Sequence, residues 1–433
     1  MQTGKGILIS VLALAVALIA LAIAGQIVWK LNIVESRIDQ GFGRLETQLA
    51  ALRSQLNATE QHVLQIGEFY KTRLTEINES ISFLTKVARL ETGQVPVRYA
   101  HFTMMYEGNA YILTDSIGRR ILLVQRGMDP TIASYLRAKY RPDLVVEYPI
   151  KSAVYMSSTF VGMVYRLYEE ARDPRVLRSI AGIMWGRRYE WHLPEVKAML
   201  ENGTIKDVGP ANSPNYEAIL ALKPDVIFVY LYPGPYGTEA VIQRLNQLGL
   251  PYVVVNDYAE SSPLGRFEWI KFFAAFLNMT DAANSIFDKV VSKWEQLTNL
   301  VSDLDKPSVA WFCIYRGVIY PAREQARELI RLAGGRYAYA NYTHVDLEVV
   351  LAHKNIDILI WSCYGPTSVK DIINIEPRLA ELRPLIIGRA YAISKAYWQL
   401  SNAYPERLIE ELISIIHPEV MPPANFTLFV YLK

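Results

Sequence analysis

Cysteine is scarce in this sequence of 433 residues, which contains only Cys313 and Cys363. Two cysteines are too few for a framework of disulfides or for an all-cysteine zinc site. The six histidines are scattered without the spacing of metal ligands, so we expect neither a metal site nor a resident cofactor. An excess of one charge is also missing, because 45 basic residues oppose 43 acidic residues. This balance argues against a nucleic-acid-binding protein.

Motifs that carry enzymatic chemistry are absent from the sequence. It has no Gly-x-Ser-x-Gly nucleophile elbow, no phosphate-binding P-loop and no His-Glu-x-x-His zinc motif. Disorder is excluded as well, because 51% of the residues are hydrophobic. We therefore expect a folded protein that is not an enzyme.

Charge is absent between Lys5 and Lys30, where Ile, Leu, Val and Ala dominate. A helix of this length reaches about 36 Å, which is enough to cross the apolar core of a bilayer. We therefore expect residues 1–28 to form an uncleaved transmembrane anchor. Two alternatives remain open: a signal peptide cleaved at the small residues Ala22-Ile23-Ala24, and processing at Lys5-Gly6 as in archaeal pilins.

Sequons for N-linked glycosylation are more frequent than the composition of the chain predicts by chance. Glycans are added to surface segments of secreted proteins. We therefore expect the bulk of the chain, C-terminal to the anchor, to be extracellular. The acceptors are Asn57, Asn78, Asn202, Asn278, Asn341 and Asn425.

A repeat of seven residues begins at Val28 and continues to Val87. Apolar side chains occupy fourteen of its eighteen core positions, a pattern typical of coiled coils. Residues 29–92 are therefore predicted to form a coiled-coil stalk, continuous with the membrane helix. Because anchored copies point the same way, a parallel homo-oligomer is the simplest assembly, and an antiparallel helix hairpin is the alternative.

From residue 96 onward, short apolar runs alternate with helical stretches. The first pattern is a hairpin that pairs Ala110–Thr114 with Arg120–Val124. Such alternation predicts an α/β fold with largely parallel sheets. The other candidate strands are Ser152–Met156, Val226–Tyr230, Tyr252–Val255, Val309–Cys313, Ile358–Trp361 and Ala390–Ile393.

One pattern occurs twice in this part of the chain. Glu217 opens a helix that is followed by Asp225 and an apolar run, and Glu348 opens a helix that is followed by Asp357 and another. The repeat predicts two similar Rossmann-like lobes, over residues 96–280 and 304–420. A single long helix at 281–303 would join them, because apolar residues between Asp281 and Val301 recur at helical spacing. Residues 421–433 are left as a tail.

Several motifs resemble the solute-binding proteins of ABC transporters for iron-siderophores, haem and cobalamin. The resemblance lies in Thr114–Arg119, in Asp207–Pro210, and above all in Ser213–Asp225, which reads Ser-Pro-Asn-Tyr-Glu-Ala-Ile-Leu-Ala-Leu-Lys-Pro-Asp. Weaker matches follow in the order of that family. They are Leu332–Gly335, Glu348, Asp357, Tyr397-Trp398 and His417–Glu419.

The resemblance implies that a ligand is captured in a cleft between two lobes and is delivered to an ABC permease. By motif, Glu217 and Glu348 would be the acids that dock onto the arginines of the permease. Acids in the first turn of a helix are also stabilised by the helix dipole, so both could be ordinary first-turn acids. The ligand would be a metal chelate or a corrinoid.

The cleft of such a fold lies at the carboxyl ends of the strands. Aromatic, arginine and hydroxyl side chains there suit flat, oxygen-rich ligands. The candidates are Ser157, Ser158, Thr159, Trp185, Arg187, Tyr230, Tyr232, Tyr236, Tyr315, Arg316, Trp361, Tyr364, Tyr397 and Trp398. Cys313 and Cys363 each end a predicted strand and would be either a disulfide or two small buried residues.

These patterns predict a membrane-anchored, extracellular solute-binding protein of archaeal character that serves an ABC importer. The main alternative is a structural or adhesive protein of the cell envelope that keeps the binding fold without transport. A sensor is disfavoured, because few residues precede the membrane segment.

Overall fold

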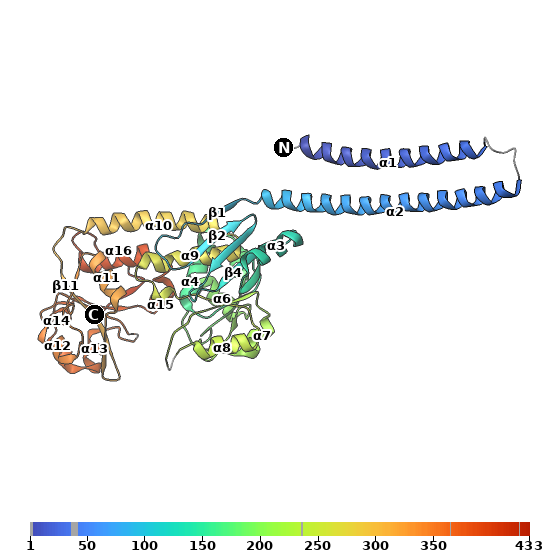
Figure 1. Ribbon diagram of the computed structural model, residues 1–433. Coiled ribbons are helices and arrows are strands. Elements are labelled where there is room, and N and C mark those ends of the chain that lie inside the picture. The colour runs from blue at the N-terminus through green and yellow to red at the C-terminus, as the bar shows by residue number, and fades with distance from the viewer. Residues whose placement is uncertain (1–2, 36–41, 235–236, 364, 424) are drawn as a thin grey trace. The chain divides into compact units, whose positions relative to one another are not determined.

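The computed structural model describes residues 3–35, 42–234, 237–363, 365–423 and 425–433 (Figure 1). The chain divides into two compact units, Met1–Leu90 and Glu91–Lys433. Each unit is described by itself.

The first unit consists of helix α1 (Thr3–Glu35) and helix α2 (Phe42–Ala88). Within α1, the stretch Val11–Lys30 has a mean hydropathy of 2.7 and is long and apolar enough to cross a membrane. None of this stretch is buried by the rest of the chain. An apolar surface left uncovered in this way fits a membrane anchor or a signal segment.

Helix α2 is 47 residues long and carries most of the seven-residue repeat. Its core positions Leu56, Tyr70, Ile77 and Leu84 are between 36% and 62% exposed, so a single chain does not bury them. Helix α1 contacts α2, as in a helix hairpin. The predicted continuity of the two helices depends on residues 36–41, which lie outside the described residues. The parallel homo-oligomer stays a prediction.

The second unit opens with a five-stranded sheet. The predicted hairpin is confirmed as the antiparallel pair β3–β4. The other three strands were not predicted, and they include β5, which pairs with β4 in parallel after helix α3 (Pro130–Tyr140). In order across the sheet, the strands are β1 (Thr92–Gln94), β2 (Thr103–Glu107), β3 (Ala110–Thr114), β4 (Arg120–Gln125) and β5 (Leu144–Tyr148).

The second sheet is the core of the first lobe, and all its strand pairs are parallel. Its order across the sheet is β10 (Tyr252–Val254), β9 (Val226–Val229), β6 (Ala153–Tyr155), β7 (Ile180–Ile183) and β8 (Lys206–Asp207). The helices that alternate with these strands are α4 (Ser158–Ala171), α5 (Pro174–Arg178), α6 (Pro194–Glu201), α7 (Tyr216–Leu222) and α8 (Glu239–Gln247). The predicted strands at 152–156, 226–230 and 252–255 are confirmed within a residue or two.

The third sheet is the core of the second lobe. Its order is β12 (Val318–Pro321), β11 (Ser308–Tyr315), β14 (Ile358–Trp361), β15 (Ala390–Ile393) and β16 (Phe429–Tyr431), and β13 (Arg336–Tyr337) also pairs with β11. The central strands β11, β14 and β15 are parallel, whereas β12 and β16 are antiparallel. Strand β16 belongs to the stretch that the sequence left as a tail. Residues 429–431 are therefore part of this lobe.

The helices of the second lobe surround this sheet. They are α11 (Glu324–Leu332), α12 (Leu347–Ala352), α13 (Val369–Ile375), η2 (Pro377–Glu381), α14 (Arg383–Ile387), α15 (Tyr397–Leu400) and α16 (Pro405–Ile416).

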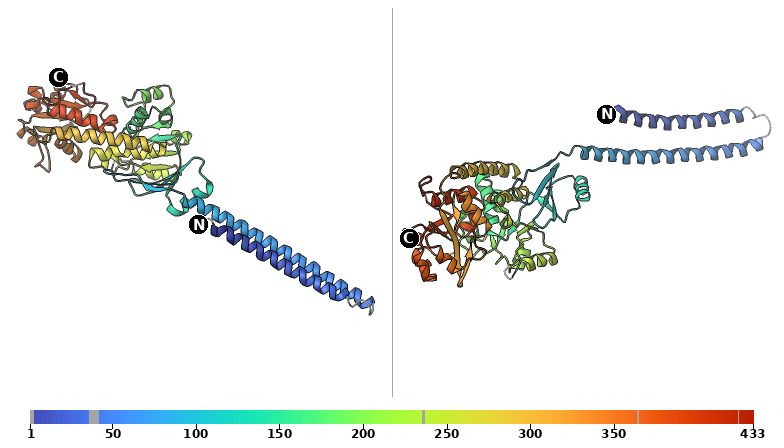
Figure 2. Two further views of the ribbon diagram at one scale, coloured as in Figure 1. Left: turned by 90° about the horizontal axis from the view of Figure 1, so that it is seen from above. Right: turned by 60° about the vertical axis from the view of Figure 1, so that its left-hand side comes forward.

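Two helices lie between the sheets of the two lobes along the chain, α9 (Pro263–Leu277) and α10 (Thr280–Leu300). Helix α10 packs on α9 and α4 of the first lobe and on α16 of the second, and Figures 1 and 2 show it spanning both. Helix α9 is buried along almost its whole length. The lobes are therefore joined by a buried helical layer as well as by the chain itself.

The repeated Asp residues have the same structural role in both lobes. Asp225 precedes β9, and its Oδ2 accepts hydrogen bonds from the backbone N–H groups of Lys151 and Ser152, 2.6 and 3.1 Å away, just before β6. Asp357 precedes β14 and accepts from the N–H and Oγ of Ser308, at 2.8 and 2.7 Å, at the start of β11. In each lobe the carboxylate thus fixes the beginning of the neighbouring parallel strand.

Candidate functional site

A hollow of about 600 Å³ lies where the two lobes meet. The first lobe contributes η1 (Asp257–Ala259) and the first turns of α9. The second lobe contributes the carboxyl-terminal parts of β11, β12 and β15, residues after β14, and helices α11 and α15. Ligands of open α/β sheets bind at the carboxyl ends of strands, and the hollow occupies this position in the second lobe. Its size suits a small organic ligand or a metal chelate.

Arg266 is the central basic residue of this hollow. Its guanidinium is held in place by the first lobe, because Nη2 donates to the carbonyl oxygen of Tyr258 at 2.5 Å and Nε donates to that of Glu260 at 3.3 Å. Burial lowers the pKa of Arg266, against the attraction of the neighbouring Asp257. A guanidinium fixed in this way is ready to meet an anionic group without losing much freedom.

A second arginine, Arg323, lines the hollow from the other lobe, where it stands just before helix α11. It is exposed, and its charge acts on Arg266 to lower the pKa of that residue. Two guanidinium groups near one another repel unless an anion lies between them. The pair therefore favours a ligand that carries negative charge.

Below Arg266, the lobes are joined by a buried polar contact. Asn402 donates from Nδ2 to Oδ2 of Asp257 over 2.9 Å, and both side chains are almost fully buried. Burial raises the pKa of Asp257, although hydrogen bonds from Thr159 and Asn402 oppose this shift. Of this pair only Asn402 lines the hollow, and the contact joins residues that are distant in sequence.

Aromatic rings provide much of the wall. Tyr320 and Trp398 are 48% and 43% exposed, which is unusual for such large side chains and leaves their faces free for a ligand. Tyr397 is buried and packs edge-on against Trp398, with 5.2 Å between ring centroids. Tyr258 stands opposite, on the first lobe.

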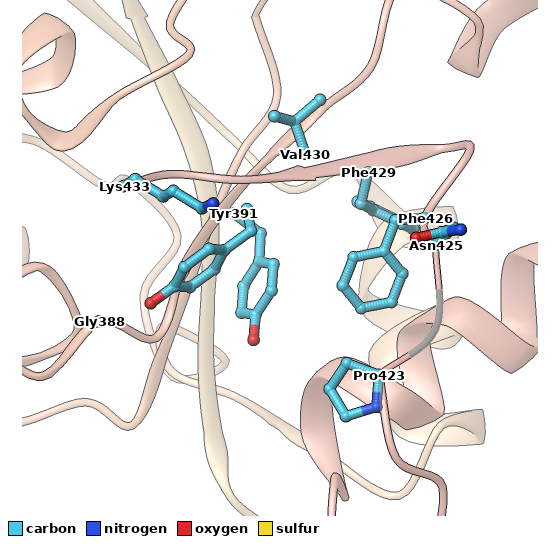
Figure 3. Close-up of a pocket in the computed structure, with 9 residues that line it drawn as sticks. Gly388, Tyr391, Pro423, Asn425, Phe426, Phe429, Val430 and Lys433 are labelled. Atoms are coloured by element: carbon cyan, nitrogen blue, oxygen red, sulfur yellow. The ribbon is translucent and has the colours of Figure 1, made fainter.

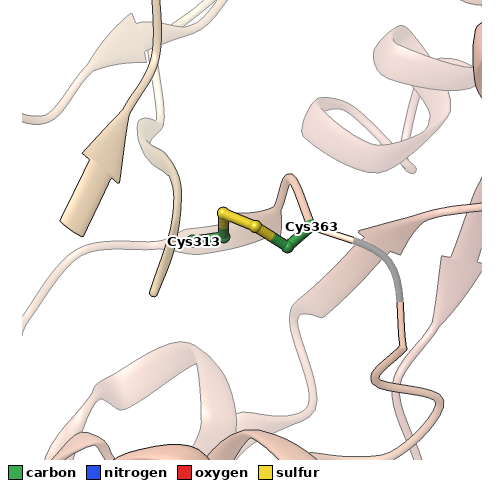
Figure 4. The surroundings of a disulfide bond; sticks show 2 residues. All are labelled: Cys313 and Cys363. Atoms are coloured by element: carbon green, nitrogen blue, oxygen red, sulfur yellow. A yellow bond between two sulfur atoms is a disulfide. The ribbon is translucent and has the colours of Figure 1, made fainter. Parts of the chain in front are cut away.

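A disulfide bond joins Cys313 at the end of β11 to Cys363 after β14 (Figure 4). Their Cα atoms are 5.5 Å apart, and both residues line the hollow. Of the two predicted alternatives, a disulfide or two small buried residues, the structure has the disulfide. The bond ties together the two strands whose ends support the aromatic wall.

Two of the predicted lining residues, Tyr397 and Trp398, lie in the hollow. Ser158 lies next to it, because its Oγ donates to the carbonyl oxygen of Trp398 at 3.4 Å. Ser157 and Thr159 bond to each other through their side chains at the start of α4. Tyr236 and Tyr364 lie outside the described residues.

Other predicted residues stand at the margin of the hollow or away from it. Tyr230 and Tyr232 pack against Tyr258, at 6.4 and 5.6 Å between ring centroids. Tyr315 and Arg316 form the exposed turn between β11 and β12, where the guanidinium lies 5.3 Å from the ring centroid of Tyr315.

Three predicted residues lie in turns or in the core. Trp185 and Arg187 belong to a turn after β7, where Asp207 accepts the N–H of Arg187 at 3.0 Å. The prediction that Trp361 lines the cleft is wrong. Trp361 is fully buried against Phe312, because this last residue of a central strand faces the core.

The sequence prediction missed Arg266, Arg323, Tyr258, Tyr320 and Asn402. A signal for Arg266 was present. Helix α9 is apolar on all sides except for Arg266, Glu268 and Lys271, and charged residues are almost never buried without partners. Glu268 and Lys271 do have partners in each other, 2.8 Å apart, whereas Arg266 faces the hollow.

Glu217 and Glu348 are exposed in the first turns of α7 and α12. The N-caps of these helices are Asn215 and Asp346, whose side chains accept backbone N–H groups. Neither glutamate is therefore needed to cap its helix.

All six predicted glycan acceptors are exposed. Within the described part of the chain, no group of three or more His, Cys, Asp or Glu residues is placed to hold a metal ion.

Comparison with known proteins agrees with this architecture. An uncharacterized lipoprotein of Methanocaldococcus jannaschii, MJ0878, is 29% identical over 326 residues, which are 72% of this chain and 77% of that protein. A periplasmic heme-binding protein from Pseudomonas aeruginosa has the same fold, with a TM-score of 0.52 and 16% identity over 66% of this chain and 98% of its own. Helicobacter pylori CeuE gives a TM-score of 0.52 and 14% identity, over 72% of this chain and 89% of its own.

The family model described as periplasmic binding protein matches residues 162–396. This range contains most of the first lobe, both joining helices and the three central strands of the second lobe, β11, β14 and β15. The chain therefore belongs to the periplasmic binding protein family.

Proposed function

We propose that this protein captures an anionic metal chelate, of the iron-siderophore or haem type, or a corrinoid-type ligand, in the hollow between its lobes and delivers it to an ABC importer. The observation that carries the proposal is the hollow of about 600 Å³ in which Arg266 is fixed by two backbone carbonyl groups. A fixed guanidinium recognises carboxylate or catecholate oxygens by charge-assisted hydrogen bonds.

The aromatic wall supports a ligand with flat, apolar parts. Tyr320 and Trp398 expose their faces in the same hollow as Arg266. Rings of this kind stack on a porphyrin, a catecholate or a corrin. Haem and ferric siderophores combine flat or aromatic parts with anionic oxygens, and so fit both features. A corrinoid with amide side chains would use the wall but not the arginines.

Delivery is proposed to use Glu217 and Glu348. Each is exposed on a different lobe and is free of a capping role, so each can form an ion pair with a permease. Helix α1 would keep the protein at the membrane as a single-pass anchor, with the lobes outside the cell.

A ligand screen with the full chain in detergent tests this proposal. Haemin, a ferric catecholate chelate, ferric citrate and cyanocobalamin are added in turn, and thermal unfolding and tryptophan fluorescence are recorded. We expect the anionic chelates to raise the melting temperature and to quench fluorescence. The quenching should decrease in Trp398→Phe, whereas Trp29→Phe outside the lobes is the matched control. If none of the four probes stabilises the protein, the proposal is wrong.

A further inference from the structure

A second hollow lies at the far edge of the third sheet, away from the cleft. It has a volume of about 690 Å³ and is bordered by β15, β16 and the segment before β16 (Figure 3). Four of its nine lining residues are aromatic. The residues are Gly388, Tyr391, Pro423, Asn425, Phe426, Phe429, Val430, Tyr431 and Lys433.

The rings of this hollow form a connected group. Tyr391 packs against Phe426 at 6.0 Å and against Tyr431 at 5.6 Å between ring centroids. Tyr431 is 40% exposed, and Ile386 and Ile387, which precede the lining residue Gly388 in sequence, are 70% and 47% exposed. Apolar patches of this kind on soluble surfaces are usually covered by a partner.

The same place is an open edge of a sheet. Strand β16 is the last strand on its side of the third sheet and pairs only with β15 among the described strands. Such an edge offers its free backbone groups to other chains, and proteins protect edges with charge, bulges or covering groups. Lys433 is a charge close to β16, but the aromatic hollow beside the strand has no cover from the described residues.

A sequon stands at the rim of this hollow. Asn425 is exposed and lines the hollow, and it is followed by Phe426 and Thr427, so that Asn425-Phe426-Thr427 is an acceptor for an N-linked glycan. Figure 3 shows Asn425 at one end of the hollow and Pro423 nearby. A sugar attached at this position would begin within reach of the rings.

We infer that Asn425 is a glycosylation site whose first sugars lie in the hollow beside Tyr391, Phe426 and Tyr431 and cover the edge strand β16. The apolar face of a sugar ring packs on aromatic side chains, while its hydroxyl groups remain in water. The glycan is a bulky, solubilising group, and it would close the edge to other chains. This inference does not depend on the ligand of the cleft.

The test uses the full chain, produced in a eukaryotic secretory host that attaches N-glycans beginning with N-acetylglucosamine. Glycopeptide mass spectrometry measures occupancy at Asn425. Hydrogen exchange of residues 429–431 and the melting temperature report on the contact. Two variants, Asn425→Gln and Thr427→Ala, remove the sequon in different ways, and Thr427→Ser preserves it.

We expect Asn425 to be occupied in the parent chain and in Thr427→Ser. Both sequon-free variants should exchange faster at residues 429–431 and unfold about 2 °C lower. The backbone bonds of Thr427 to Glu411 and Ser394 do not involve its hydroxyl, so Thr427→Ala should not disturb the loop by itself. In Tyr431→Ala, removal of the sequon should have little further effect, because the contact is already lost.

The matched control is Asn341→Gln, which removes an exposed sequon outside the lining of this hollow. It should change the glycan mass but not the exchange of β16. Two results would overturn the inference: an empty Asn425 in a host that fills Asn341, or an occupied Asn425 whose removal leaves the exchange at 429–431 and the melting temperature unchanged.

Discussion

The lobe built on β9 and the lobe built on β14 begin their central strands in the same way. Asp225 and Asp357 each hold the start of the neighbouring strand through backbone N–H groups, and each meets an arginine, Arg126 at 3.2 Å and Arg383 at 2.6 Å. Beyond this shared device the lobes differ. The first gives the cleft its fixed arginine, whereas the second gives most of the aromatic wall and the disulfide.

This contrast separates the parts of the repeated fold that are alike from the parts that differ. The beginnings of the strands are occupied by the bonds that hold the sheet together, so they stay alike. At the carboxyl ends of the strands, the side chains differ between the two lobes. Four sets of variants test this difference between the lobes, from the largest expected effect to the smallest.

The disulfide should give the second lobe a stability that the first lobe lacks. Replacing Cys313 and Cys363 by serine removes a crosslink between residues that are 50 apart in sequence. In the chain-entropy model, a disulfide that closes a loop of this size stabilises the folded state by about 4 kcal/mol. Denaturant unfolding of the full chain measures the loss. Hydrogen exchange should increase in β11 and β14 and not in β6 and β9. An equal increase in the strands of both lobes would show that the disulfide does not stabilise the second lobe in particular.

The two arginines of the cleft should contribute unequally. Arg266→Gln removes a partly buried guanidinium that is already positioned, and we expect about 100-fold weaker binding of an anionic chelate. Arg323→Gln removes an exposed charge, which is screened by solvent, so about threefold weaker binding is expected. Titration by tryptophan fluorescence measures both. Equal effects of the two variants would show that the first lobe has no special role.

The paired aspartates should be equivalent. Asp225→Asn and Asp357→Asn each weaken charge-assisted bonds to two donors of a neighbouring strand and to an arginine. A cost of about 2 kcal/mol in the free energy of unfolding is expected for each, measured by denaturant unfolding at neutral pH. Ligand affinity should change little in either variant. A loss of stability in only one of the two variants would show that the aspartates do not have the same role.

A smaller effect separates Asp257 of the first lobe from Asp357 of the second when pH is varied. Burial raises the pKa of Asp257 above its ordinary value of 3.8. The folded state therefore holds that proton more tightly, and stability is lost as pH rises from about 4 through the raised pKa. Relative to Asp257→Asn, the parent chain should be more stable in acid than at neutral pH.

Asp357 should show the opposite trend. Burial alone would raise its pKa, but hydrogen bonds from Ser308 and the guanidinium of Arg383 outweigh burial and hold the pKa below 3.8. Its stabilising contribution is present above the ordinary value and is lost as pH falls below it. Thermal unfolding of the parent, Asp257→Asn and Asp357→Asn between pH 3 and pH 7 compares the two directions. Parallel pH profiles for the two variants would contradict these shifts.

The strands that sequence analysis placed best are those buried on both faces. Strands β14 and β15 have the predicted bounds, because buried parallel strands are continuous apolar runs. Strand β16 was missed because its three residues, Phe429–Tyr431, follow a proline-rich segment and become a strand only by pairing with β15. Strands β1 and β2 were missed for the same reason, since their pairing depends on residues brought together by folding.

The site could be predicted only where aromatic residues follow a strand, as Tyr397 and Trp398 do. The hollow also contains Arg266 from a helix, Tyr258 from a single turn and Asn402 from a loop. No local sequence pattern predicts that these three residues lie close together. Trp361 was placed wrongly because a strand end in sequence does not reveal which side of the sheet a side chain faces. Helix α9 contained the usable clue, three charged residues within an apolar helix.

Two of those charges, Glu268 and Lys271, have a mechanical consequence. The fully buried Glu268 accepts the N–H groups of Arg98, Tyr99 and Ala100, and Lys271 donates to the carbonyl oxygen of Pro96 at 2.8 Å. A pull on the chain ahead of residue 91 would first unzip β1, a strand of three residues. The bonds of Glu268 and Lys271 to residues 96–100 would then resist the force. The force would therefore pass into helix α9, and the strands around the cleft would not bear it.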